Sequence, residues 1–285
     1  MTIAACFKYD GGMVFCADTK ITTSMKTLQT KIYRCLYGGE GSPCATVFVL
    51  AGSVPFARAA IADCEREIGK LDLGNVSLEA LRKTTEEALV DFYRRHNPDG
   101  VDESFRLLMG VWLRGETGMF STYKSALTPV DEWDCVGSGS YIAKYWIRKF
   151  FDSESKSQRR SLPTLTDVAL ISGYALQTAM DYDESCGGQA EYVLMTAGGE
   201  VGSDVCPNIY PCDELPDRFQ AAMWRMLRKL SHSIDTESVE TVLDEFGAET
   251  RKIAQARIDW LNALLEALKR SIERDERLHP KTASS

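Results

Sequence analysis

The chain has 285 residues, of which 44% are hydrophobic and 26% charged, as expected for one large globular domain or a domain with an appendage. Its net charge of −8 argues against nucleic acid as a partner, because phosphate binding needs a basic face. No apolar run approaches the length that spans a bilayer, and the first residues show no signal-peptide pattern. We therefore expect a cytoplasmic protein with no membrane partner.

The nine cysteines are scattered and form no CxxC pair. Several lie in apolar segments, where a free cysteine packs as a small hydrophobic residue. This pattern favours a reducing compartment over a disulfide scaffold or a zinc site. The three histidines are far apart and flanked by polar residues, so we expect them on the surface and predict neither a metal nor a cofactor.

The first predicted element is a β-hairpin. Apolar runs at residues 3–7 and 13–17 flank Asp10-Gly11-Gly12, a turn signal. If Asp10 and Gly11 form a two-residue turn, the numbers of paired residues sum to 21. Thr2 would then face Thr19, and Asp18 would lie one step away.

Further elements follow in chain order. We expect strands at residues 31–36 and 45–51, helices at 55–71 and 77–96, strands at 104–114, 118–124 and 129–136, helices at 140–151 and 164–180, and a last hairpin at 190–196 and 200–205. The order of strands and helix pairs fits an α+β domain with two sheets face to face and helices outside each. A doubly wound fold would need regular alternation, and no nucleotide-binding motif is present.

The composition changes near Pro211. Residues 216–231 are amphipathic, and residues 236–278 form one long helical pattern with a narrow, coiled-coil-like apolar stripe. Such a helix could pack on its own domain or against another subunit, with equal weight. We therefore predict a domain at 1–210 and a helical extension at 211–285 that ends in disorder.

Thr2 is a candidate nucleophile. Its small side chain allows removal of Met1, which would leave a hydroxyl and a free α-amine on one residue. A terminal threonine can be a nucleophile activated by its own amine. The alternative is an ordinary β-branched residue that opens a strand, and a retained Met1 would leave no basic amine.

Four short matches together resemble one family. They are Thr2 with the segment 12–19 (GMVFCADT), Lys31-Ile32, the segment 50–53 (LAGS), and the segment 136–140 (VGSGS) followed by 183–188 (DESCGG). In this order they resemble the proteasome β-type peptidases, which include the bacterial heat-shock-locus protease and ancestral bacterial β-type homologues. The resemblance covers about residues 2 to 206 and implies a four-layer α/β/β/α sandwich of the N-terminal nucleophile hydrolase type.

The resemblance also implies a role for each matching residue. Thr2 would be the nucleophile and its amine the base. Lys31 would supply positive charge, and Asp18 would hold Lys31. The remaining catalytic candidates are Gly52, whose N–H would bind the oxyanion, Ser138 and Asp183, which would hold the amine and its water, and Cys186.

Two features depart from the family. The segment between Asp18 and Lys31 is about three residues shorter than usual, and Cys186 stands where the family has serine. A thiol is the weaker hydrogen-bond partner.

Substrate binding is implied for Ile21, Thr22, Leu50 and Val54. The apolar members of this set would favour cleavage after hydrophobic residues.

The resulting hypothesis is a threonine endopeptidase that acts on proteins or peptides. The resemblance implies a homo-oligomeric ring or spiral and an AAA+ ATPase unfoldase as partner. Two alternatives stay open: a small-molecule amidase of the same fold, and a ring scaffold without activity.

Overall fold

The computed structural model describes residues 2–22, 26–38, 43–96, 104–152 and 162–202, together with residues 226, 241–242, 244–248, 252 and 255. The chain divides into two compact units, Met1–Ser203 and Asp204–Ser285. The few described residues of the second unit are helical. The predicted boundary at 210 and most of the predicted helix at 236–278 lie outside the described residues. None of the helices that the structure describes is long and apolar enough to cross a membrane.

One five-stranded antiparallel sheet contains the chain's first strands. Its order is β10 (Trp133–Gly137), β1 (Ile3–Tyr9), β2 (Gly12–Asp18), β11 (Ala190–Thr196) and β12 (Val201–Gly202). The β1–β2 hairpin pairs Ala4 with Ala17 and Tyr9 with Gly12, so the numbers of paired residues sum to 21. The predicted hairpin register is therefore confirmed.

A second five-stranded antiparallel sheet faces the first. Its order is β5 (Ile32–Tyr37), β6 (Cys44–Gly52), β7 (Phe105–Leu113), β8 (Glu116–Tyr123) and β9 (Ala126–Pro129). A small ribbon of β3 (Lys20–Thr22) and β4 (Lys26–Leu28) follows β2. This ribbon was not predicted, because its threonines and lysines lack an apolar alternation.

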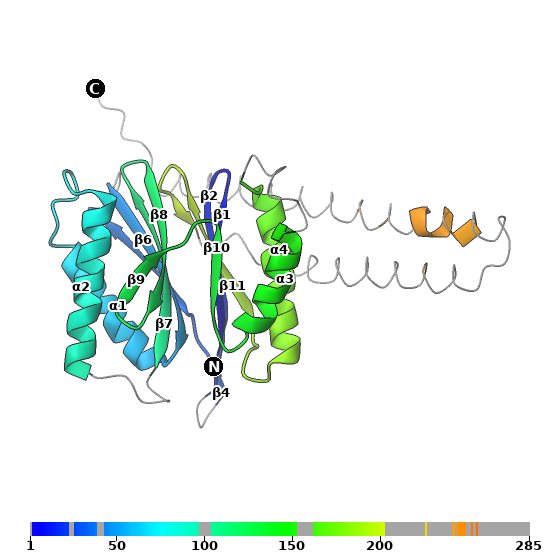
Figure 1. Cartoon of the computed structure of the whole chain (residues 1–285), viewed down its shortest axis with the longest axis horizontal. Coiled ribbons are helices and arrows are strands. Elements are labelled where there is room, and N and C mark those ends of the chain that lie inside the picture. The colour runs from blue at the N-terminus through cyan, green and yellow to red at the C-terminus, as the bar shows by residue number, and fades with distance from the viewer. Residues whose placement is uncertain are drawn as a thin grey trace, which may run out of the picture. The chain divides into compact units, whose positions relative to one another are not determined.

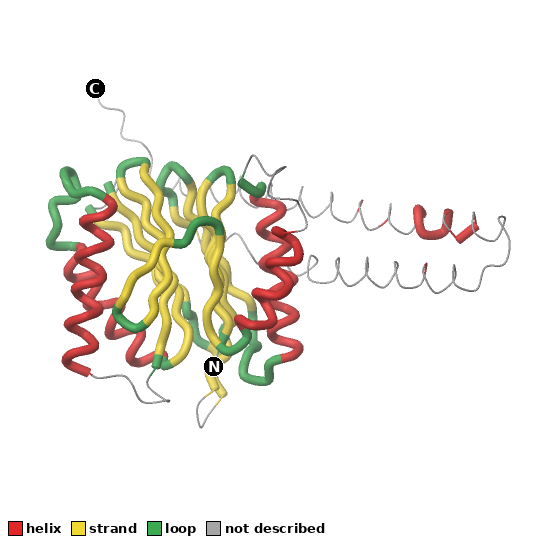
Figure 2. Tube along the Cα trace, viewed as in Figure 1, coloured by secondary structure: helices red, strands yellow, loops and turns green. Residues whose placement is uncertain are grey.

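Two helix pairs contact the two sheets from outside. Helices α1 (Val54–Ile68) and α2 (Leu78–His96) contact the second sheet, and α3 (Ser140–Asp152) and α4 (Leu165–Tyr182) contact the first. Figures 1 and 2 show the sheets between these pairs. At the start of α4, Thr164 and Asp167 form a reciprocal capping box. The mixed α+β class is also confirmed.

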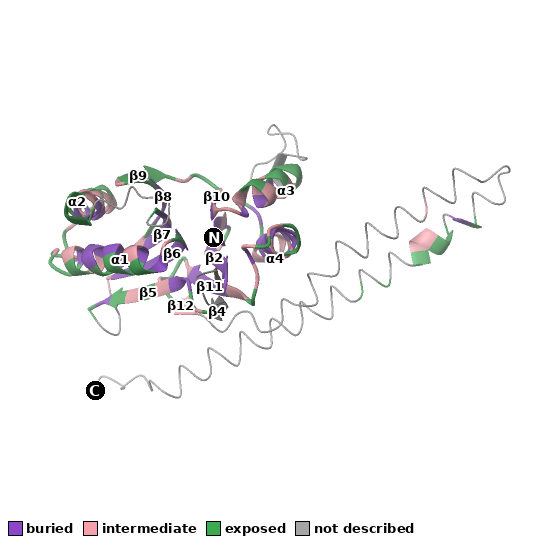
Figure 3. Cartoon of the chain, turned by 90° about the horizontal axis from the view of Figure 1, so that it is seen from below, coloured by how far each residue is buried: buried purple, intermediate pink, exposed green. Residues whose placement is uncertain are grey.

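The apolar residues form two clusters. One lies between the sheets and includes Phe15, Val47, Val49 and Val136. The other lies between the second sheet and helices α1 and α2, and Figure 3 shows the buried inner face of α1. Because successive residues of β6 point to opposite faces, this one strand contributes to both clusters.

Two strand predictions were wrong in their bounds. The predicted strand at 129–136 is two strands in different sheets, β9 and β10. Pro129 ends β9 because it has no N–H to donate, and the chain then crosses to the other sheet. The β7–β8 turn lies at Arg114 and Gly115, both with positive φ (49° and 91°), and not at residues 115–117.

The close approach of the two sheets at Gly110 can be tested. A Cβ at Gly110 would lie 2.1 Å from Cζ of Phe15, a fully buried ring. We expect Gly110→Ala to lower the free energy of unfolding by about 1–3 kcal/mol, the usual cost of overpacking. Denaturant unfolding measures it. The matched control is Gly198→Ala, where the added methyl makes an ordinary 3.6 Å contact. Equal stability of the two variants would contradict the packing described here.

Candidate active site

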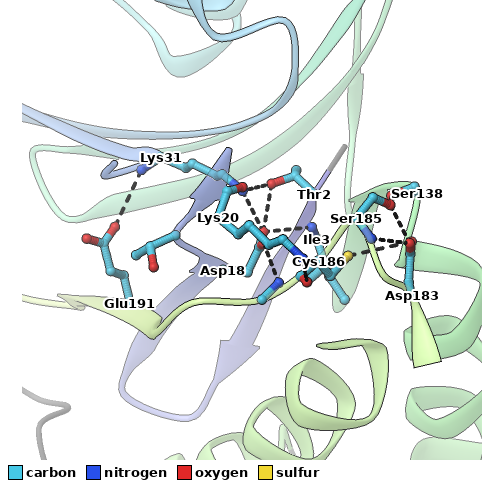
Figure 4. Close-up of polar contacts among 12 residues, drawn as sticks. Thr2, Ile3, Asp18, Lys20, Lys31, Ser138, Asp183, Ser185, Cys186 and Glu191 are labelled. Carbon is cyan, nitrogen blue, oxygen red and sulfur yellow. Dashed lines mark hydrogen bonds and ion pairs between the residues drawn. The ribbon is translucent and has the colours of Figure 1, made fainter. Parts of the chain in front are cut away.

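The two sheets bring three predicted residues together. Thr2 precedes β1 and Asp18 ends β2, so the hairpin places them side by side. Lys31 precedes β5 of the other sheet, and its carbonyl accepts the N–H of Leu50 at 3.0 Å. Figure 4 shows the three side chains meeting where the sheets face each other.

Asp18 is the hub of this group and is fully buried. Its Oδ1 accepts the Thr2 hydroxyl at 2.6 Å, the Ile3 N–H at 2.9 Å and the Lys31 ammonium at 2.7 Å. Its Oδ2 accepts the N–H of Gly187 at 3.0 Å. Such a set of donors is what a buried carboxylate needs to stay charged.

Lys31 has only 1% of its surface exposed. Its Nζ donates to Oγ of Thr2, to Asp18, and to the carbonyl of Lys20 at 2.6 Å. Burial lowers the pKa of the Lys31 ammonium, and the attraction of Asp18 opposes this without cancelling it. Lys31 therefore releases its proton more readily than a solvated lysine.

A second polar cluster surrounds Asp183. Its Oδ1 accepts both the N–H of Ser185, at 2.9 Å, and the Ser185 hydroxyl. The Ser185 hydroxyl lies 3.1 Å from that of Ser138, and the Cys186 thiol donates to Oδ2 of Asp183 at 3.6 Å. Burial favours the neutral acid, but the hydrogen bonds outweigh it and the pKa of Asp183 is lowered.

Cys186 is a hydrogen-bond donor here. Burial, and then the charges of Asp18 and Asp183, raise the pKa of its thiol to about 12. The thiol therefore stays protonated and is a poor nucleophile.

Glycines let the neighbouring turn reach the start of the chain. A Cβ at Gly137 would lie 2.0 Å from the carbonyl oxygen of Thr2, and its φ is +102°. The N–H of Gly139 donates to the same oxygen at 3.3 Å. No other residue type fits at Gly137 without moving Thr2.

Gly52 ends β6 and is exposed. Its φ is +96°, and a Cβ there would lie 2.3 Å from the carbonyl of Ser104. A glycine is therefore required at this strand end. Gly52 lies two residues after Leu50, whose N–H holds the carbonyl of Lys31.

Three of the four predicted substrate-binding residues lie close together in the structure. Leu50 and Val54 belong to the apolar cluster under α1, and Ile21 packs against it. Leu50 is fully buried, so Ile21 and Val54 are the members nearer the surface. The side chain of Thr22 lies outside the described part of the chain.

Three residues near the site were not predicted. Ser185 stands two residues after Asp183, a spacing at which an aspartate commonly accepts the N–H, so this residue could have been found. Glu191 accepts the Lys31 N–H at 3.4 Å, and Lys20 donates to the 184–186 backbone. Those two contacts depend on strand pairing between distant segments, which the local sequence does not reveal.

Comparisons with known proteins bear on the fold. No protein-family model and no curated protein matches the chain. Solved structures do, and one is Anbu, described as an ancestral β-subunit, from Yersinia bercovieri, with a TM-score of 0.62 at 14% identity over 79% of this chain and 97% of that chain. A Gly-1 mutant of Anbu from Hyphomicrobium sp. strain MC1 has a TM-score of 0.63 at 14% identity over 81% and 100%.

A third match is a structure of the helical assembly of the Anbu complex from Pseudomonas aeruginosa. Its TM-score is 0.58 at 14% identity, over 80% of this chain and 96% of that chain. At this identity the likeness shows the fold alone. The chain thus has the fold of these Anbu proteins.

The pairing of Asp18 with Lys31 leads to a stability prediction. Asp18→Asn removes the counter-charge of a buried ammonium, and breaking such a pair costs about 3–5 kcal/mol. The loss should shrink as the pH rises from 6 to 9. The reason is that Asp18 opposes the lowering of the Lys31 pKa by burial, so that without Asp18 the folded variant gives up the Lys31 proton more readily than the native protein does, while the unfolded chain keeps it.

Urea unfolding across that pH range measures the effect. Asp131→Asn, at an exposed position, is the matched control and should change stability by less than about 0.5 kcal/mol. A small loss for Asp18→Asn, or one that grows with pH, would contradict the buried charge pair.

Proposed function

We propose that this protein is a threonine-type peptidase that hydrolyses peptide bonds with Thr2 after removal of Met1. The observation that carries the proposal is the buried contact of Oγ of Thr2 with both Lys31 Nζ and Asp18 Oδ1. A hydroxyl that serves only as a strand residue has no need of a buried ammonium at its oxygen. In the family that the four sequence matches resemble, the nucleophile is a terminal threonine.

The first step is attack of the Thr2 Oγ on the scissile carbonyl. The free α-amine, with an ordinary pKa of about 7.7–8.0, accepts the hydroxyl proton directly or through a water. Lys31 donates to Oγ and stabilises negative charge there as the proton leaves. Its positive charge also favours the neutral form of the amine, which is the form that acts as a base.

The acyl step then completes. The new Oγ–carbon bond forms, the carbon–nitrogen bond of the substrate breaks, and the leaving amine takes the proton. The N–H of Gly52 would stabilise the oxyanion in between. Water next hydrolyses the ester, which releases the acid and restores Thr2.

The cluster around Asp183 has a supporting role. An ionised Asp183 with Ser138 and Ser185 provides acceptors for the protonated amine and its water. Cys186 replaces a hydroxyl with a thiol but still donates to Asp183. Asp183 therefore still has a hydrogen-bond donor at this position, although a thiol is a weaker donor than a hydroxyl.

Ile21, Leu50 and Val54 suggest an apolar primary pocket. Cleavage after hydrophobic residues follows from this chemistry. Thr22 belongs to the same proposal as a backbone neighbour in β3.

The wider architecture is also part of the proposal. We propose that the two sheets and their helix pairs form a four-layer α/β/β/α sandwich, and that the chain comprises a domain at 1–210 and a helical extension at 211–285. One structural neighbour is described as a helical assembly, which supports a homo-oligomeric ring or spiral for this chain. An enclosed peptidase in the cytoplasm would need an ATP-driven unfoldase, such as an AAA+ partner, to supply unfolded chains.

The second candidate is a small-molecule amidase of the same fold. Activity on small amides with none on peptides would select it. A scaffold without activity is the less favoured reading, because Thr2, Asp18 and Lys31 are all present and in contact.

The nucleophile can be tested on protein made in cells. We expect the intact mass to lack Met1, and a β-lactone or peptidyl boronate to modify Thr2, because its amine is then free to act as the base. Thr2→Ala should lose labelling entirely, and Thr117→Ala, at an exposed threonine of β8, should keep the native labelling. Retention of Met1, or labelling elsewhere, would exclude the mechanism.

The role of Lys31 can be tested by its pH profile. Lys31→Met should slow β-lactone labelling of Thr2 by roughly 10²–10⁴-fold. It should also move the rising limb of the rate to higher pH, because the amine loses the cation that keeps it neutral. Labelling rates between pH 6 and 9 measure both effects. The control Lys83→Met removes an exposed lysine of α2 and should match the native rate. An unshifted limb would show that Lys31 does not tune the amine.

A further inference from the structure

Lys20 contacts two parts of the candidate site, Lys31 and the 184–187 loop. It opens β3, two residues after Asp18. Its carbonyl accepts Nζ of Lys31 at 2.6 Å, and its N–H donates to the carbonyl of Gly187 at 2.9 Å. Its own ammonium donates to the carbonyls of Glu184 and Cys186, the latter at 3.1 Å. Figure 4 shows this side chain running from the Lys31 end of the site to Cys186.

The 184–187 loop, which Lys20 contacts, also supplies a hydrogen bond to Asp18. Gly187 donates its N–H to Oδ2 of Asp18. This loop carries two consecutive glycines with positive φ, +142° and +83°, so its backbone has little intrinsic preference for one conformation. The aliphatic stem of Lys20 covers it, since a Cβ at Gly187 would lie 3.2 Å from Cδ of Lys20.

The negative charges near Cys186 also favour the position of the Lys20 ammonium. Asp18 and Asp183 both act on the Cys186 thiol, which lies between them. Among the described residues, Lys31 forms its ion pair with Asp18. The Lys20 ammonium on the Cys186 and Glu184 carbonyls places a positive charge near the thiol on which both carboxylates act.

From these contacts we propose that Lys20 is a positioning residue: its ammonium fixes the 184–187 loop so that Gly187 holds Asp18, and Asp18 in turn orients Lys31 and Thr2. The proposal rests on the proposed function for its effect on rate, but the placement of the loop is independent of it. Lys20 touches no reacting atom, so it acts only through Asp18 and Lys31.

The test compares Lys20→Met with Lys20→Arg in the full chain. Methionine keeps the stem and removes the charge and donors, while arginine restores both. We expect Lys20→Met to speed hydrogen–deuterium exchange in peptides that span residues 184–189. It should slow the maximal rate of Thr2 labelling by β-lactone by about 10- to 100-fold, the scale of a misplaced catalytic group, with an unchanged concentration dependence. Lys20→Arg should recover both readouts.

Lys8→Met is the matched control, because Lys8 is a half-buried lysine of β1 in the same sheet as Asp18. It should change neither readout. If Lys20→Met does not fold, Lys20→Gln, which keeps part of the donor capacity, takes its place with intermediate effects expected.

The outcomes separate the two proposals. Native exchange and native labelling in Lys20→Met would overturn the positioning role, as would a failure of arginine to recover them. If the native protein does not label but Lys20→Met still loosens residues 184–189, the proposed peptidase activity fails and the positioning of the loop stands.

Discussion

The described fold depends on a buried charge pair that joins its two sheets. Asp18 ends a strand of one sheet and Lys31 precedes a strand of the other, and both have almost no exposed surface. Transfer of either charge from water costs several kcal/mol, which one hydrogen bond does not repay. The surrounding donors and acceptors are therefore part of the pair: the Thr2 hydroxyl, the Ile3 and Gly187 N–H groups and the Lys20 carbonyl. Four chain segments must meet correctly before the pair is stable.

The charged groups of the candidate site lie in two places, at Thr2 and at the 184–187 loop. Lys31 contacts the Thr2 hydroxyl, and Lys20 contacts the backbone of the 184–187 loop. Asp18 accepts from Lys31, and Asp183 accepts from Cys186. Burial lowers the pKa of Lys31, while hydrogen bonds lower that of Asp183. One group is thereby brought closer to losing its proton, and the other is kept charged. Both pKa values are lowered, and shifted pKa values of neighbouring groups cluster at functional sites.

Much of this could be expected from the sequence, for identifiable reasons. The Asp10-Gly11 turn sets the β1–β2 register, and that register alone brings Asp18 next to Thr2. The helices were predicted because apolar residues recur at helical spacing and caps such as Thr164 mark their starts. The β3–β4 ribbon was missed because its pairing depends on contacts with Gly187 and Gly188 rather than on its own pattern. The crossing at Pro129 was missed because a short apolar run does not reveal which sheet it joins.

The peptide unit between Thr2 and Ile3 is held at both of its polar atoms. Gly139 donates to its oxygen, and its N–H donates to Asp18. The main chain therefore sets the location of the Thr2 side chain, and the methyl group of threonine has no part in those two bonds. On such a frame, serine or cysteine would present its own heteroatom from the same starting point. Evolutionary exchange among the three would alter intrinsic reactivity while the scaffold stayed as it is.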